Sequence, residues 1–103
     1  MKGIAQFRLG SEERVVQYDN LLGVNGKYLI NKYGDVISLS RSKPLKTYYD
    51  KKGSFIMIQN KKKYIHRLLA NQYILNENNY FHINHIDGNI YNNSLNNLEW
   101  KLH

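Results

Sequence analysis

The chain has 103 residues, which leaves room for one compact domain. Hydrophobic residues make up 42% of it and nine tyrosines are present, enough apolar surface for a small folded core. The formal net charge of +7 favours a polyanionic partner such as nucleic acid, and the absence of cysteine excludes a disulfide scaffold, a thiolate zinc site and a cysteine nucleophile.

No apolar run approaches the roughly 20 residues that a membrane-spanning helix needs. The first residues also lack the long apolar segment of a signal peptide. We therefore expect a cytoplasmic protein without a membrane partner.

The first half of the sequence favours β-structure. Residues 1–18 indicate a strand or two around residues 9–12 and give no sign of a function. Two β-prone runs, 28–30 and 36–39, flank a segment with Asn, Gly and Asp, so they predict a hairpin.

A second hairpin and a helix are predicted next. The run 54–59 follows a turn signal at 50–53, and the polar residues 60–63 separate it from a return strand at 64–66. Apolar residues then recur at helical intervals, which predicts a short helix over 66–74. Its Leu68 and Leu69 are expected to face the core.

The last part of the chain predicts another hairpin. Residues 81–86 alternate enough to form a strand that the Asp87-Gly88 turn closes, and 98–100 form the return strand. The asparagine-rich stretch 89–97 lies between them, and its amides offer both donors and acceptors.

The positive charge is concentrated between Lys27 and Arg67, a segment with eleven basic and two acidic residues. Five tyrosines alternate with these cations, as expected of a surface that touches phosphates and sugars. A solvated face of short hairpins with tyrosines packed beneath it remains an alternative. The residues expected to contact DNA are Lys43, Lys46, Lys51, Lys52, Lys61, Lys62, Lys63 and Arg67.

Several spaced motifs carry a family resemblance. Residues 83–89, 92–93 and 97–100, together with 64–70 upstream, resemble the HNH homing endonuclease family of phages. Its members share a His-Arg-Leu helix, an Asn/Asp-His-x-Asp-Gly-Asn turn and an Asn-Leu-Glu-Trp strand. Residues 26–39 are similar to the small DNA-binding module that often precedes the nuclease domain. The resemblance covers residues 18–102 and is specific because the motifs occur in the family's order.

The resemblance implies an α+β fold with short β-hairpins, one central helix and the β-hairpin of a ββα-metal motif whose final helix is missing or truncated. It divides the chain into an N-terminal extension, 1–17, a basic β-hairpin module, 18–60, and an HNH-like motif, 61–103, with the last two packed as one unit. If the protein is encoded by a bacteriophage, the bacterial host cytoplasm is its expected location.

The resemblance also assigns roles to residues. His85 takes the place of the general base, which at neutral pH suits a histidine. Asn84 takes the place of the first metal ligand, and because its amide oxygen adds no charge, we expect Mg²⁺ or Mn²⁺ to be held weakly. Asn97 matches the middle Asn, which braces the loop and orients the histidine.

The third element of the family's site is a His or Asn about nine residues beyond the middle Asn. The sequence ends at His103, six residues beyond Asn97, so His103 is a candidate ligand that lies too early to match that position. Either the sequence stops short of the family's last helix, or the protein is a naturally shortened relative in which cleavage is weakened or lost.

Other residues have structural interpretations. A purely structural role is also an alternative for His85, since the metal ligands expected beside it are poor. His66 is expected to begin the helix, His82 to point away from His85 because neighbouring strand residues face opposite ways, and Asp87 to form a turn rather than to bind metal. Leu98 and Trp100 are expected in the core.

The leading functional hypothesis is a metal-dependent DNA endonuclease or nickase that acts on double-stranded DNA. The alternative is a catalytically silent relative that binds DNA or a host protein as a regulator or inhibitor. A structural RNA-binding protein would rest on charge and tyrosines alone. The sequence indicates neither the target site nor the oligomeric state.

Overall fold

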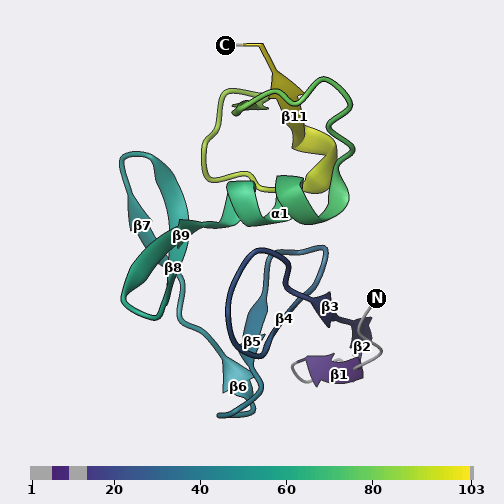
Figure 1. Cartoon of the computed structure of the whole chain (residues 1–103), viewed down its shortest axis with the longest axis vertical. Helices are drawn as coiled ribbons and strands as arrows, with labels where there is room; N and C mark the ends of the chain where they lie inside the picture. The colour runs from purple at the N-terminus through teal and green to yellow at the C-terminus, as the bar shows by residue number, and fades with distance from the viewer. Residues whose placement is uncertain (1–5, 10–13, 103) are drawn as a thin grey trace.

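The structure is a computed structural model, and it describes residues 6–9 and 14–102. Antiparallel hairpins surround a single helix, so the expected α+β fold is confirmed. The helix, α1 (Ile65–Tyr73), lies between the C-terminal hairpin above it and the N-terminal strands below it in Figure 1. No helix in the described part of the chain is long and apolar enough to cross a membrane.

Two strands form near the N-terminus, as predicted. Strands β1 (Gln6–Leu9) and β2 (Arg14–Gln17) pair antiparallel, and residues 10–13, which include most of the predicted segment 9–12, lie outside the described residues. Val16 then joins Tyr18, Leu29 and Ile37 in a small buried cluster, which attaches the end of this hairpin to the next sheet.

A four-stranded sheet follows, in the order β3-β4-β5-β6. The predicted hairpin at its centre is confirmed, while the two-residue edge strands were not predicted. The Asn31 side-chain oxygen holds the central turn, because it accepts hydrogen bonds from the amides of Tyr33 and Asp35 at 2.9 and 3.0 Å. The strands are β3 (Asp19–Asn20), β4 (Tyr28–Ile30), β5 (Val36–Ser38) and β6 (Lys43–Pro44).

A three-stranded sheet, β7-β8-β9, contains the second predicted hairpin with a different turn. Its strands are β7 (Tyr48–Asp50), β8 (Gly53–Ile58) and β9 (Lys61–Tyr64). The prediction of a return strand at 64–66 was wrong. Gln59 and Asn60 both have positive φ, which makes the tight turn that a two-residue hairpin loop needs, so the three lysines lie in the strand.

Helix α1 supplies the centre of the main core. It begins and ends one residue before the predicted bounds. Leu68 and Leu69 are buried, as predicted, and they pack with Ile30, Ile56 and other residues of the four-stranded and three-stranded sheets. The helix therefore joins the basic hairpins to the C-terminal hairpin in one core. The predicted boundaries at 17/18 and 60/61 stay predictions.

The C-terminal hairpin consists of β10 (His82–His85) and β11 (Leu98–Lys101), paired with Asn84 opposite Glu99 and His85 opposite Leu98. Both strands lie within one or two residues of their predicted bounds. Leu98 is in the core as predicted. Trp100, also expected in the core, is only half-buried, and its indole N–H donates to the Ile74 carbonyl at the end of α1.

Candidate active site and nucleic-acid interface

His85 lies at the end of β10 and faces inward. Its side chain is 9% exposed, and its ring packs against the ring of His66, with 5.0 Å between the centroids. Its Nε2 atom lies 2.9 Å from the side-chain oxygen of Asn93. The histidine expected to be the base is therefore held on one side by α1 and on the other by the asparagine-rich loop.

Asn97 braces this loop from its closing turn, η2 (Leu95–Asn97). Its buried side chain accepts a hydrogen bond from the Asp87 amide at 3.0 Å and donates to the Asp87 carboxylate and the Asn92 carbonyl at 3.0 and 2.8 Å. The side-chain partner of the His85 ring is Asn93 rather than Asn97. The backbone carbonyl of Asn97 also accepts a hydrogen bond from the Ile86 amide. Asn97 therefore holds the loop next to His85 through backbone contacts.

Asp87 is the turn-forming residue that the sequence favoured. Its carboxylate accepts hydrogen bonds from the Asn92 side chain and the Asn89 amide, both at 2.8 Å, besides the bond from Asn97. These bonds, that from Asn92 most of all, hold the pKa of Asp87 below its ordinary value. Every one of them stabilises the loop, so Asp87 is committed to the turn.

Contacts to the β7–β8 turn dock the loop onto the middle sheet. The Tyr91 hydroxyl donates to the Asp50 carbonyl at 2.6 Å, and the Asn93 amide donates to the Ser54 hydroxyl at 2.8 Å. Gly53 makes room beside them: it has φ of +135°, and a Cβ there would lie 3.4 Å from the Ile90 carbonyl. The sequence pattern predicted the loop but not these partners, which are far apart in the chain.

Asn84 points to the opposite face of β10 from His85, as strand alternation requires. Its amide donates to the Glu99 carboxylate across the hairpin at 2.7 Å, leaving the amide oxygen as a candidate metal ligand. No group of three or more His, Cys, Asp or Glu side chains that could hold a metal occurs among the described residues. His103, the other candidate ligand, lies outside them.

The remaining histidines occupy the places expected of them. His66 lies in the first turn of α1, and burial, with smaller contributions from His85 and Arg67, lowers its pKa to about 4. Among the described residues, its buried Nδ1 atom has no hydrogen-bond partner. His82 is exposed and packs edge to face on Phe81, away from His85.

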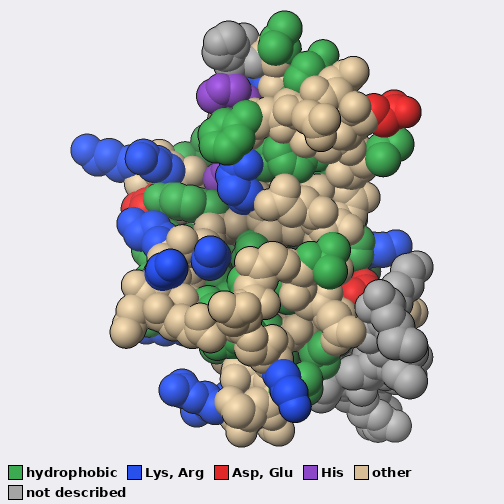
Figure 2. Space-filling model, viewed as in Figure 1, with side chains coloured by type: hydrophobic (Ala, Val, Ile, Leu, Met, Phe, Trp, Pro, Cys, Tyr) green, Lys and Arg blue, Asp and Glu red, His purple; other side chains and the backbone are tan. Residues whose placement is uncertain are grey.

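Lysine and arginine side chains gather over the β7–β9 hairpins and near β6 at the lower end of the molecule (Figure 2). Six of the eight residues expected to contact DNA are exposed, and the other two, Lys63 and Arg67, are half-buried. Lys62 forms an ion pair with Asp50 at 2.9 Å and lies over the Phe55 ring at 4.4 Å. Arg67 donates to the Phe81 carbonyl at 3.0 Å, so this cation also ties α1 to the segment before β10.

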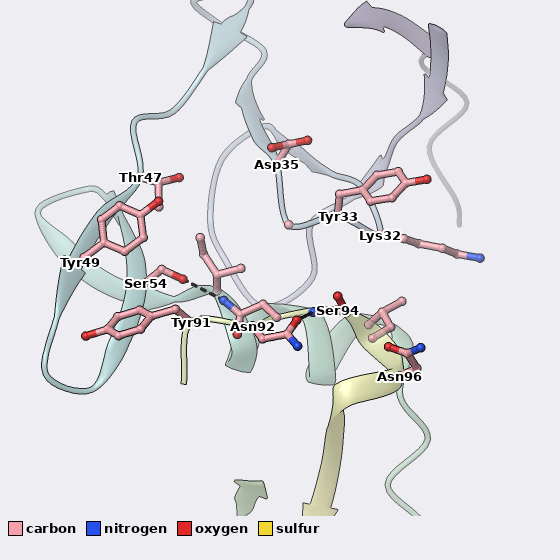
Figure 3. Close-up of a pocket in the computed structure, with 14 residues that line it drawn as sticks. Lys32, Tyr33, Asp35, Thr47, Tyr49, Ser54, Tyr91, Asn92, Ser94 and Asn96 are labelled. Atoms are coloured by element: carbon pink, nitrogen blue, oxygen red, sulfur yellow. Dashed lines mark hydrogen bonds between the residues drawn. The ribbon is translucent and has the colours of Figure 1, made fainter. Parts of the chain in front are cut away.

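A polar hollow of about 680 Å³ lies between the β4–β5 turn and the asparagine-rich loop. Tyrosine rings and asparagine amides line it, and Ser54, which accepts the bond from Asn93, stands at its wall (Figure 3). The hollow therefore opens beside the hydrogen bonds that lead to His85.

Comparisons with known proteins were made for the sequence and for the fold. No protein-family model matches the sequence. Two uncharacterized HNH endonucleases of Acanthamoeba polyphaga mimivirus are 45% and 39% identical to it, over 74% and 71% of this chain. The chain spans about a quarter and a fifth of their respective lengths.

A solved structure of DNA binding and cleavage by the HNH homing endonuclease I-HmuI is also similar. It matches 82% of this chain with a TM-score of 0.66 and 31% sequence identity, and the match covers 52% of that chain. The two relatives and the solved structure are all proteins of the HNH type. By sequence and by fold, this chain belongs to the HNH endonuclease family.

Proposed function

We propose that this chain binds double-stranded DNA and hydrolyses its phosphodiester bonds with the help of Mg²⁺ or Mn²⁺, as a nickase or endonuclease. The observation that carries the proposal is His85, a histidine held by a helix and a loop at the position of the family's base. The similar HNH homing endonuclease I-HmuI binds and cleaves DNA, which supports the same substrate.

In this proposal His85 takes the proton of the attacking water. General-base catalysis by a positioned histidine contributes about 10²–10⁴-fold to a rate. Asn97 holds the turn that presents His85, and Asp87 serves that turn rather than the reaction.

Oxygen donors on the other face of the hairpin from His85 fit a hard cation. Asn84 offers an amide oxygen, and Glu99, hydrogen-bonded to it, offers a carboxylate. A bound divalent ion would neutralise charge that develops on the phosphate oxygens. Mg²⁺ is commonly held by one or two carboxylates together with substrate phosphates, so two side chains suffice for weak binding.

The basic surface supplies the DNA affinity in this proposal. The exposed lysines on β9, the β7–β8 turn and the segment around β6 lie on elements that pack into the same core as the His85 hairpin. Neutralising phosphates releases counterions, which drives binding at low salt. The cytoplasmic location, the phage origin and a host-protein partner stay predictions.

The test incubates the purified chain with supercoiled plasmid, with Mg²⁺, with Mn²⁺ and with a chelator, and follows nicked and linear products. We expect metal-dependent nicking that His85→Ala abolishes while DNA affinity is retained. His82→Ala is the matched control, because His82 is exposed on the same strand. Plasmid binding without nicking in either metal would replace the proposal by its alternative, a silent relative that acts by occupying DNA.

A further inference from the structure

A chain of side-chain hydrogen bonds links His85 to the middle sheet. The Nε2 atom of His85 lies 2.9 Å from the side-chain oxygen of Asn93, whose amide nitrogen donates to the Ser54 hydroxyl at 2.8 Å. Ser54 lies on β8 and is 4% exposed, and His85 is 9% exposed. In the structure the amide of Asn93 lies between these two buried groups, with its carbonyl oxygen toward the ring and its nitrogen toward the Ser54 hydroxyl.

This orientation decides where the proton of the neutral imidazole lies. A carbonyl oxygen only accepts hydrogen bonds, so with the Asn93 amide in this orientation the Nε2 atom of His85 is the donor. A neutral imidazole has a single N–H group, and the hydrogen bond at one nitrogen fixes the other. The Nδ1 atom then holds the free lone pair.

We propose that Asn93 is a positioning residue that holds His85 in the tautomer protonated on Nε2, so that Nδ1 is the atom that accepts the proton of water. The proposal rests on the function proposed above. In that reaction an O–H bond of water breaks and its proton goes to Nδ1, while the oxygen bonds to phosphorus. The bond from phosphorus to the 3′ oxygen breaks with its electron pair on that oxygen, which takes a proton from solvent.

Elements outside the C-terminal hairpin help to hold His85 and Asn93 in place. His66 packs on the His85 ring, which limits its rotation, and the bond from Tyr91 to the Asp50 carbonyl holds the loop that carries Asn93. Ser54 belongs to β8, which lies well before the hairpin motif in the chain. The middle sheet thus sets the protonation of the candidate base as well as presenting lysines.

The first test is nuclear magnetic resonance of the nitrogen-15-labelled, metal-free chain at about pH 8.5, above the range where imidazoles ordinarily titrate. The His85 signals are assigned by their loss in His85→Ala. We expect a protonated Nε2 and an unprotonated Nδ1. An unprotonated Nε2 in the wild-type chain would overturn the proposal, whatever the chain does to DNA.

Two variants separate positioning from folding. Asn93→Leu removes the acceptor at similar volume and is expected to give a mixture of His85 tautomers, whereas Asn93→Asp keeps an acceptor and the Nε2-protonated form. Asn96→Leu, at an exposed asparagine of the same loop, is the control and should leave the signals unchanged. Retention of the pure tautomer in folded Asn93→Leu would show that Asn93 does not fix it.

The nicking assay adds a second readout. Asn93→Leu is expected to lower kcat by about 10- to 100-fold, the range typical of residues that orient a functional group from behind, with KM for DNA changed by less than about 2-fold. An unchanged kcat would contradict the positioning role. If the wild-type chain does not nick at all, the proposed function fails, and the resonance experiment alone still decides whether Asn93 sets the tautomer.

Discussion

His66 and His85 pack ring against ring in a T-shaped arrangement, with their centroids 5.0 Å apart. His66 is half-buried, and burial lowers its pKa to about 4, so it is uncharged at neutral pH. An uncharged neighbour places no second positive charge beside His85 when that ring takes up a proton. His66 is therefore an uncharged packing partner for the candidate base.

The lowered pKa of His66 predicts a pH-dependent stability. Unfolding restores a pKa of about 6.5, so as pH falls from about 6.5 to 4 the unfolded chain binds the proton first and the folded state loses stability. We expect His66→Gln to reduce the acid-induced loss of unfolding free energy by roughly 1–3 kcal/mol. This range allows for solvent screening, because His66 is only partly buried. Urea melts at about pH 7 and 4.5 measure it. His82→Gln, at an exposed site, should keep the wild-type slope, and the same slope in His66→Gln would contradict the prediction.

Leu69 anchors the core that joins the sheets. Leu69 is 0% exposed, and its helix packs with the four-stranded sheet, the three-stranded sheet and the C-terminal hairpin. Leu69→Ala is therefore expected to lower the free energy of unfolding by roughly 2–5 kcal/mol. Leu75→Ala is the control, because Leu75 is 78% exposed and should change stability by less than about 0.5 kcal/mol. Equal losses in urea melts of the two variants would show that α1 does not carry the core.

Local sequence patterns were enough to predict most of the helices and strands. The helix and the first and last hairpins follow from apolar spacing and turn residues, which act within a few positions of the chain. Two-residue edge strands such as β3 and β6 leave no period to detect. The turn at Gln59 and Asn60 was missed because Asn60 was grouped with three lysines as one polar loop, while its positive φ suits a hairpin turn.

Some residues of the candidate site could be identified from the sequence, and others only from the fold. Motif spacing identified His85, Asn84 and Asn97 as candidates, and their assigned roles stay predictions. Asn93 and Ser54 could not be paired from the sequence, since 39 positions separate them and the folded sheet brings them together. The run of asparagines was a partial signal, because each short amide can bond a backbone amide two residues ahead, as Asn89 does to Tyr91.

The salt dependence of DNA binding tests the basic surface. Replacing Lys61, Lys62 and Lys63 with Ala is expected to flatten the slope of log affinity against log salt by up to about 3, since each neutralised phosphate contributes about 0.9. Lys62 should contribute least, because its ammonium group already faces Asp50. Lys27→Ala, at an exposed lysine outside the expected set, serves as the control. An unchanged slope in the triple variant would remove β9 from the interface.

The last prediction concerns the metal. Asn84 donates to the Glu99 carboxylate at 2.7 Å, so Asn84→Asp places two carboxylates opposite each other across the hairpin. Like charges in directly opposed strand positions repel, and the metal-free variant is expected to lose about 0.5 kcal/mol of stability. A hard divalent ion relieves this repulsion, because it prefers carboxylate oxygens and gains affinity with their charge.

We therefore expect Mn²⁺ to raise the Tm of Asn84→Asp more than that of the wild-type chain, with metal affinity about 10-fold higher and plasmid nicking increased. Glu99→Gln combined with Asn84→Asp is the matched control, because it removes the second carboxylate and should cancel most of the added metal effect. Thermal melts over a series of Mn²⁺ concentrations measure the affinity without any need for cleavage. Equal Tm shifts in the wild type and Asn84→Asp would exclude Asn84 as a metal ligand. A larger shift without nicking would instead place the metal at Asn84 and leave the chain without the nuclease activity proposed for it.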